Sequence, residues 1–173
     1  MRLCLVVTLF LLGVSRSSLA DVGFRLGPRI GLELHKDPDL FTGADVRLSF
    51  TRSPLTINPT FDYYFDEDRT LYQVGVNALY SLPIPARVID PYLGAGVGVN
   101  IFSYRAGVPT DDDQGTRVGL NLIGGVCLDL PVLSPFAQVM ISVGDIDLVA
   151  IGGGVLFDFV GDESSWDSCG RRR

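Results

Sequence analysis

Apolar and polar residues alternate strictly along residues 24–34, FRLGPRIGLEL. The even positions are apolar. The odd positions are glycine or charged, namely Arg25, Gly27, Arg29, Gly31 and Glu33. Because successive side chains of a β-strand point to opposite faces, this segment predicts a strand with one apolar face and one face of charges and glycines. The same division recurs down the chain, which favours an inside-out protein whose apolar face lies outside.

Eight such segments follow residue 20, each about as long as a membrane-spanning strand of roughly 9–11 residues. They span residues 23–34, 40–50, 55–65, 70–82, 88–102, 116–130, 135–144 and 148–159. No segment has the i, i+3, i+4 spacing of an amphipathic helix over a useful length. Short strands at regular spacing, with turn residues between them, predict an all-β sandwich or barrel. The connections alternate between short proline-containing links and more polar ones, as do the turns and loops at the two ends of a membrane barrel.

One parity of these segments carries a nearly balanced set of charges. The set comprises Arg25, Arg29, Glu33, Asp45, Arg47, Asp62, Arg117, Asp129 and Asp158. Charges of both signs can form ion pairs inside a closed lumen, where an unpaired charge would be costly. An eight-stranded barrel has an interior just wide enough to be filled by side chains, so we expect this lumenal charge network to leave no large pore. We expect the glycines of the same parity to provide the space that long arginine side chains need.

Aromatic residues of the other parity lie near segment ends. They are Phe24, Phe50, Phe61, Tyr63, Phe65, Tyr72, Tyr80, Phe157 and Phe159. Such rings are typical of the interfacial girdles of membrane barrels. A soluble lipocalin-like ligand-binding barrel, with an apolar interior, is the alternative with the same strand number. We therefore expect an all-β fold, an eight-stranded antiparallel up-and-down transmembrane β-barrel with a polar, side-chain-filled lumen.

Residues 1–20 predict a secretory signal peptide. Arg2 precedes the apolar run 3–14, which is too short to span a membrane as a helix, and small residues at Ser18 and Ala20 suit cleavage. Residues 21–160 then form the barrel domain, and residues 161–173 form a polar periplasmic C-terminal tail.

Two cysteines remain once Cys4 leaves with the signal. We expect Cys127 to be a packed thiol and Cys169 a loose one, with a disulfide between them as the alternative.

Composition agrees with this interpretation. Hydrophobic residues make up 47% of the chain and the mean hydropathy is +0.31, which is high for a soluble domain with 20% charged residues. The formal net charge is −6, which argues against binding to nucleic acid.

The run 91–99, PYLGAGVGV, and the final segment 152–159 resemble strands of the small bacterial outer-membrane β-barrel family, which includes the OmpA-type transmembrane domain and OmpX-like proteins. Gly154, Phe157 and Phe159 match the family's Gly-x-x-aromatic-x-aromatic insertion signal, although Gly152 stands where a polar residue is expected. The resemblance implies a porin-family protein of the Gram-negative outer membrane that contacts lipids and lipopolysaccharide and is inserted by the barrel-assembly machinery. It implies a structural or surface-interaction role without cofactors, and it leaves the surface partner unknown.

His35, the only histidine, is the residue that most suggests an enzyme. It lies in the first expected outside loop, and lipid A palmitoyltransferases are small barrels with a catalytic histidine in such a loop. Asp66 or Asp68 could supply a carboxylate, but no serine stands beside them, and a catalytic base needs its nucleophile within reach. We therefore expect no catalytic residues and no enzyme, with an outer-membrane lipid-modifying enzyme as the alternative.

Two acidic runs, 66–68 and 111–113, lie in expected outside loops. They lack the ligand spacing of a dedicated calcium loop, so we expect no metal site. Cation bridging between these loops and lipopolysaccharide phosphates is a hypothesis.

Overall fold

The structure, a computed structural model, describes residues 22–34, 39–50, 53–65, 69–84, 88–104, 114–128, 130, 133–145 and 147–160. Its strands are β1 (Val22–Glu33), β2 (Asp39–Phe50), β3 (Leu55–Phe65), β4 (Arg69–Ser81), β5 (Ile89–Tyr104), β6 (Gln114–Leu128), β7 (Ser134–Gly144) and β8 (Leu148–Val160). Each strand pairs antiparallel with the next, and β8 pairs with β1, which closes the barrel. The predicted eight-stranded antiparallel barrel is confirmed, and each expected segment overlaps one strand almost entirely.

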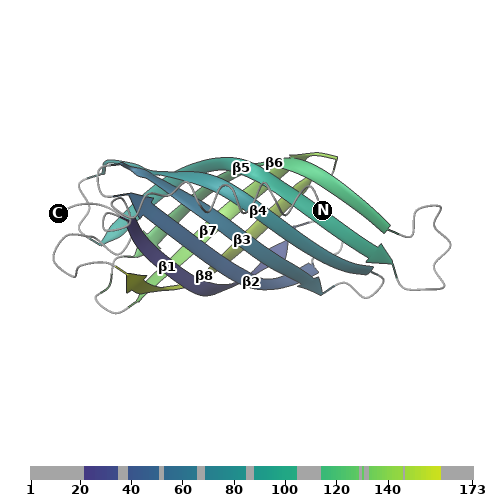
Figure 1. The fold of residues 1–173 in the computed structure, drawn as a ribbon, viewed down its shortest axis with the longest axis horizontal. Helices are drawn as coiled ribbons and strands as arrows, with labels where there is room; N and C mark the ends of the chain where they lie inside the picture. The colour runs from purple at the N-terminus through teal and green to yellow at the C-terminus, as the bar shows by residue number, and fades with distance from the viewer. Residues whose placement is uncertain are drawn as a thin grey trace, which may run out of the picture.

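The strands run diagonally around the long axis of the barrel (Figure 1). Because neighbours are antiparallel, the connections β1–β2, β3–β4, β5–β6 and β7–β8 lie at one end, which we call the loop end. The other three connections lie at the opposite end, the turn end, where β1 begins and β8 finishes. Among the described residues, no helix is long and apolar enough to cross a membrane.

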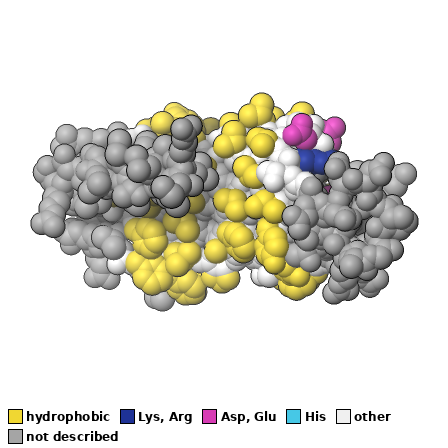
Figure 2. All heavy atoms as spheres, turned by 45° about the vertical axis from the view of Figure 1, so that its right-hand side comes forward, with side chains coloured by type: hydrophobic (Ala, Val, Ile, Leu, Met, Phe, Trp, Pro, Cys, Tyr) yellow, Lys and Arg dark blue, Asp and Glu magenta, His cyan; other side chains and the backbone are white. Residues whose placement is uncertain are grey.

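The outer face of the barrel is apolar. Large hydrophobic side chains stand exposed on every strand, and Leu122, on β6, is 55% exposed. In Figure 2, hydrophobic side chains cover the barrel wall, while the charged side chains in view gather at one end of the described surface. Outward rings form two contacting groups. Phe24 meets Phe159 near the turn end, and Tyr63 contacts Phe65 and Tyr72 near the loop end.

Candidate functional site: the lumenal charge network

The middle of the lumen holds a chain of buried charges from the first three strands. Arg29, on β1, lies with its Nε 3.1 Å from Asp62 Oδ1 on β3 and its Nη1 3.9 Å from Asp45 Oδ2 on β2. Arg47 Nε lies 3.1 Å from Asp45 Oδ1. These four residues are at most 3% exposed. Two arginines thus balance two aspartates, which is the condition under which buried charges are tolerated.

Neutral amides continue the network across the lumen. Asn58 Nδ2 donates to Asp45 Oδ1 at 2.9 Å, and Asn77 Nδ2 lies 3.5 Å from Asn58 Oδ1. Asn121 Nδ2, on β6, donates to Asn77 Oδ1 at 3.1 Å. Side chains from β1 to β4 and from β6 are therefore joined in one polar layer across the lumen.

Aromatic rings hold the arginines in place. The Arg47 guanidinium lies 4.8 Å from the Tyr92 ring centre and 4.6 Å from that of Phe136, so it is stacked between two rings. Its Nη2 donates to the Tyr92 hydroxyl at 3.1 Å, and that hydroxyl donates to Gln138 Oε1 at 2.8 Å. Arg29 stacks in the same way on Phe41, at 5.4 Å. Desolvated cation–π contacts of this kind are worth about 2 kcal/mol.

Sequence reasoning missed these three inward rings. Phe41, Tyr92 and Phe136 share the parity of the inward polar residues on their strands, and that parity was the available signal. The alternation pattern singles out only the outward aromatics, because charges and glycines define the inward face.

The inward glycines make room for the rings and amides. A β-carbon at Gly31 would lie 2.5 Å from Phe41 Cζ, and one at Gly125 would lie 2.6 Å from the Tyr92 hydroxyl. Gly31 and Gly125 each lie directly across the ladder from the ring that covers them. The expectation that these glycines make space for arginines therefore holds only indirectly. Glycine lets a ring lie flat against the barrel wall, and the arginine then stacks on that ring.

Pro59 interrupts the ladder between β2 and β3, and Asn58 repairs it. The register places Pro59 opposite Val46, but the ladder pairing is absent there because proline has no N–H to donate. Asn58 Nδ2 donates instead to Val46 O at 2.8 Å. One side-chain amide thus satisfies an orphan backbone carbonyl and also supports the Asp45 carboxylate.

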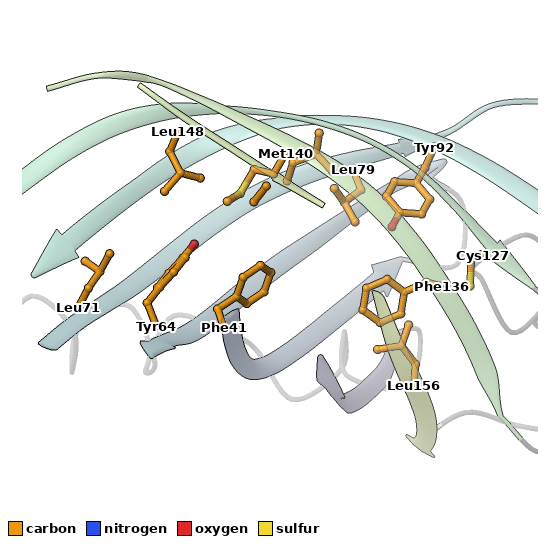
Figure 3. Close-up of a cluster of buried hydrophobic side chains, with 12 residues drawn as sticks. Phe41, Tyr64, Leu71, Leu79, Tyr92, Cys127, Phe136, Met140, Leu148 and Leu156 are labelled. Carbon is orange, nitrogen blue, oxygen red and sulfur yellow. The ribbon is translucent and has the colours of Figure 1, made fainter. Parts of the chain in front are cut away.

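Apolar side chains lie on either side of the charged layer. Figure 3 shows Phe41, Tyr64 and Leu71 in one group, which lies toward the loop end, and Phe136 and Leu156 in another, toward the turn end. All five side chains are at most 5% exposed. The polar layer therefore lies between two groups of buried apolar side chains.

The remaining predicted charges lie outside this central layer. Arg25 Nε lies 3.4 Å from Asp158 Oδ1 near the turn end, where it joins β1 to β8. Glu33 is buried near the loop end, whereas Arg117 lies on the inward parity of β6 but is exposed near the loop end. Asp129 falls outside the described residues. The nine charges thus include one central group of four rather than one continuous set.

The residues of the predicted insertion signal lie on both faces of the barrel wall, one inward and two outward. Gly154 faces inward, and a β-carbon there would lie 2.9 Å from Phe136 Cε1. Phe157 and Phe159 stand exposed on the outer face.

Several other predicted features are not central to this site. His35 and the acidic runs 66–68 and 111–113 lie outside the described residues, as do the signal peptide and the tail. No group of His, Cys, Asp or Glu side chains that could hold a metal ion occurs in the described part of the chain. Cys127 is disulfide-bonded, so the expectation of a packed free thiol is wrong.

Comparison with known proteins identifies the fold. No family model matches the chain, and no curated protein matches it. The N-terminal β-barrel domain of Pseudomonas aeruginosa OprF matches with 15% identity and a TM-score of 0.60, over 78% of this chain and 97% of that one. Neisserial surface protein A matches with 18% identity and a TM-score of 0.61, over 80% and 97%. Ail, the attachment invasion locus protein of Yersinia pestis, in complex with the heparin analogue sucrose octasulfate, matches with 12% identity and a TM-score of 0.55, over 80% and 98%. The shared feature is the small closed barrel.

Proposed function

We propose that this chain is an outer-membrane β-barrel with a structural or surface-interaction role, no enzymatic activity and no large open pore. The observation that carries the proposal is the reversed distribution of polarity, with hydrocarbon on the outer wall and a closed polar network inside. A soluble lipid-binding barrel would have the opposite distribution.

The outer wall supports the membrane location. Exposed apolar patches larger than a few hundred Å² are rare on soluble monomers, yet here the apolar face continues around all eight strands. Closed barrels are the only β-structures that satisfy every backbone group within a bilayer. Ail, which shares the fold, is described as an outer membrane protein and has a structure in a phospholipid bilayer nanodisc.

The lumen supports the absence of a large pore. The charged layer crosses the interior through direct contacts, and apolar groups lie on both sides of it. Opening a channel would require the buried Arg29–Asp62 and Arg47–Asp45 pairs to separate. Separating buried, paired charges is strongly unfavourable.

The partners that we propose follow from this location. Outer-membrane lipids and lipopolysaccharide contact the apolar wall, and the barrel-assembly machinery reads Gly154, Phe157 and Phe159 during insertion. We propose no cofactor, no metal and no nucleic acid.

Fractionation of cells expressing the full chain tests the location. We expect the protein in the outer-membrane fraction, soluble only with detergent, and migrating faster on SDS gels before heating than after. Recovery of folded protein in buffer alone would refute the proposal.

Two further measurements test the role. Planar-bilayer recording with purified protein should show no large steady conductance, with a known general porin as the positive control and detergent alone as the blank. Mass spectrometry of lipid A from cells with and without the gene should give the same species. A new acylated or deacylated form would instead favour the lipid-modifying enzyme.

A further inference from the structure

Three inward glycines lie side by side across β4, β5 and β6. The ladder places Gly98 directly opposite Gly75 on one side and Gly119 on the other. Aromatic rings cover Gly31 and Gly125, but polar atoms cover this glycine row. The atom nearest to an added β-carbon is Thr60 Oγ1 at Gly75, Asn121 Nδ2 at Gly98 and Ser142 Oγ at Gly119. This part of the wall therefore presents polar groups to the lumen.

Two side-chain amides meet over Gly98, and each has one end left over. Tyr64 Oη donates to Gln73 Oε1 at 3.1 Å, which leaves the Gln73 Nε2 donor. Asn121 Nδ2 donates to Asn77 Oδ1 at 3.1 Å, which leaves the Asn121 Oδ1 acceptor. Neither atom has a hydrogen-bond partner among the described residues, although Gln73 and Asn121 are each only 1% exposed. Buried polar groups in proteins are almost always hydrogen-bonded, so these two atoms call for a partner.

The two atoms are close enough to share one partner. A β-carbon built on Gly98 would lie 3.2 Å from Asn121 Oδ1 and 3.4 Å from Gln73 Nε2. One small molecule can therefore bridge them, because a hydrogen bond to or from oxygen is about 3 Å long. Asn100 stands directly opposite Gln73 and is 2% exposed, and its Oδ1 also has no hydrogen-bond partner in the described part of the chain. The site thus offers one donor and two acceptors.

We propose that Gln73, Asn100 and Asn121 bind an internal water molecule above the glycine row. The water accepts a hydrogen bond from Gln73 Nε2 and donates one to each of the two Oδ1 atoms. Buried waters typically make about three hydrogen bonds of this kind. A metal cation does not suit the site, because the Gln73 amide directs its protons there and Arg117, opposite Asn100, adds positive charge.

The position of the site indicates where the water exchanges. Arg117, which pairs with Asn100 across the ladder, is exposed near the loop end, so the water exchanges with solvent from that end. The charged layer of Arg29, Asp45, Arg47 and Asp62 still closes the lumen. The water lies in the interior, so its binding does not depend on the membrane location.

Water–protein cross-relaxation, measured by NMR on the full-length protein folded in detergent micelles, tests the site. A long-lived bound water gives NOE and ROE cross-peaks of opposite sign to nearby carbon-bound protons, which do not exchange with solvent. We expect such cross-peaks at the α-protons of Gly98 and of Gly75 opposite it. Gly31, which the Phe41 ring covers, is the matched control and should show none.

Substitution of Gly98 tests whether the water occupies the space between the two amides. Gly98→Ala puts a methyl group there and should abolish the cross-peak at Gly75. Gly124→Ala is the control, because its β-carbon would meet only Leu93 Cδ2, at 3.6 Å, and it should leave the cross-peak unchanged. The gel shift on heating shows whether each variant has folded. Should Gly98→Ala fail to fold, Asn100→Leu removes one acceptor at similar size and should weaken the cross-peak.

Several results would overturn the proposal. One is a folded wild-type protein without cross-peaks at Gly98, and another is equal cross-peaks at Gly98 and Gly31, which would mean general hydration of the lumen. A scalar coupling across a direct Gln73–Asn121 hydrogen bond would show that the amides satisfy each other. A shift of their side-chain amide signals when potassium replaces sodium would identify a bound cation instead. A cross-peak at Gly75 that survives in folded Gly98→Ala or Asn100→Leu at full intensity would place the water elsewhere.

Discussion

Replacing Asn58 by alanine removes the group that compensates for Pro59 in the β2–β3 ladder. In the native barrel, one Asn58 amide donates to Val46 O at 2.8 Å and to Asp45 Oδ1 at 2.9 Å. Asn58 is 0% exposed, so water cannot take its place without entering the lumen. After the substitution, Val46 O has no donor in the ladder, because Pro59 has no N–H.

The expected cost follows from the two groups that lose a partner. A buried carbonyl left without a hydrogen bond costs about 1–3 kcal/mol, and a hydrogen bond to a charged group contributes about 1.5–3 kcal/mol. Asp45 keeps Arg47 at 3.1 Å, which limits the second loss. We therefore expect Asn58→Ala to lower the free energy of unfolding by about 3 kcal/mol. Asn121→Ala, which removes a bond between two neutral amides, is the matched control and should cost about 1 kcal/mol.

Pro59→Thr supplies the missing N–H and so isolates the ladder contribution. Urea unfolding in lipid vesicles, followed by the gel shift between folded and unfolded forms, gives the stability of each variant. In the Pro59→Thr background, the cost of Asn58→Ala should fall by about 1–2 kcal/mol, because the backbone then satisfies Val46 O. If the cost of Asn58→Ala is the same in both backgrounds, the proposed repair of the ladder is wrong.

Three further predictions use the same unfolding measurement. Gly31→Ala should lower the free energy of unfolding by about 1–3 kcal/mol, because its β-carbon would lie 2.5 Å from the Phe41 ring that covers it. Gly115→Ala, with open space around it, should change that free energy by at most about 0.5 kcal/mol. Equal effects would argue against the packing role of the inward glycines. Asp45→Asn leaves Arg29 and Arg47 without their shared carboxylate and should lower the free energy of unfolding by about 3–5 kcal/mol. A decrease below about 1 kcal/mol would show that the central ion pairs add little to stability. Leu122→Arg puts a charge on the apolar wall and should lower the free energy of unfolding in a bilayer by about 2–4 kcal/mol. Thr116→Arg, near the loop end of the same strand, should lower it by at most about 1 kcal/mol. A Leu122→Arg variant as stable as the wild type would contradict the membrane location.

The strands could be predicted from sequence because their signal is local. Alternation at period two along β1 fixes which side chains share a face, and the apolar parity identifies the wall. The inward charges on β1, β2 and β3 followed from the same rule. The rule gives parity but not depth along the barrel, which is why Arg117 was grouped with Arg29 although it lies exposed near the loop end.

The contacts between inward side chains could not be predicted in this way. Whether Arg47 meets Asp45, Tyr92 or Phe136 depends on the stagger between strands that are far apart in sequence, and closure of the barrel sets that stagger. The packing of the Phe41 ring on Gly31 and the Asn58 hydrogen bond that compensates for Pro59 both depend on which residues face each other across neighbouring strands. A single strand does not specify those partners.

The sequence by itself therefore determined the class of fold, the strand order along the chain and the two faces of the wall, because side-chain alternation is a property of each strand alone. Only the tertiary structure decided that two arginines and two aspartates form a neutral layer, that rings lie over glycines to hold those arginines, and that Cys127 is bonded at the turn end. These features arise between strands, and the register that brings their side chains together exists only once β8 has paired with β1.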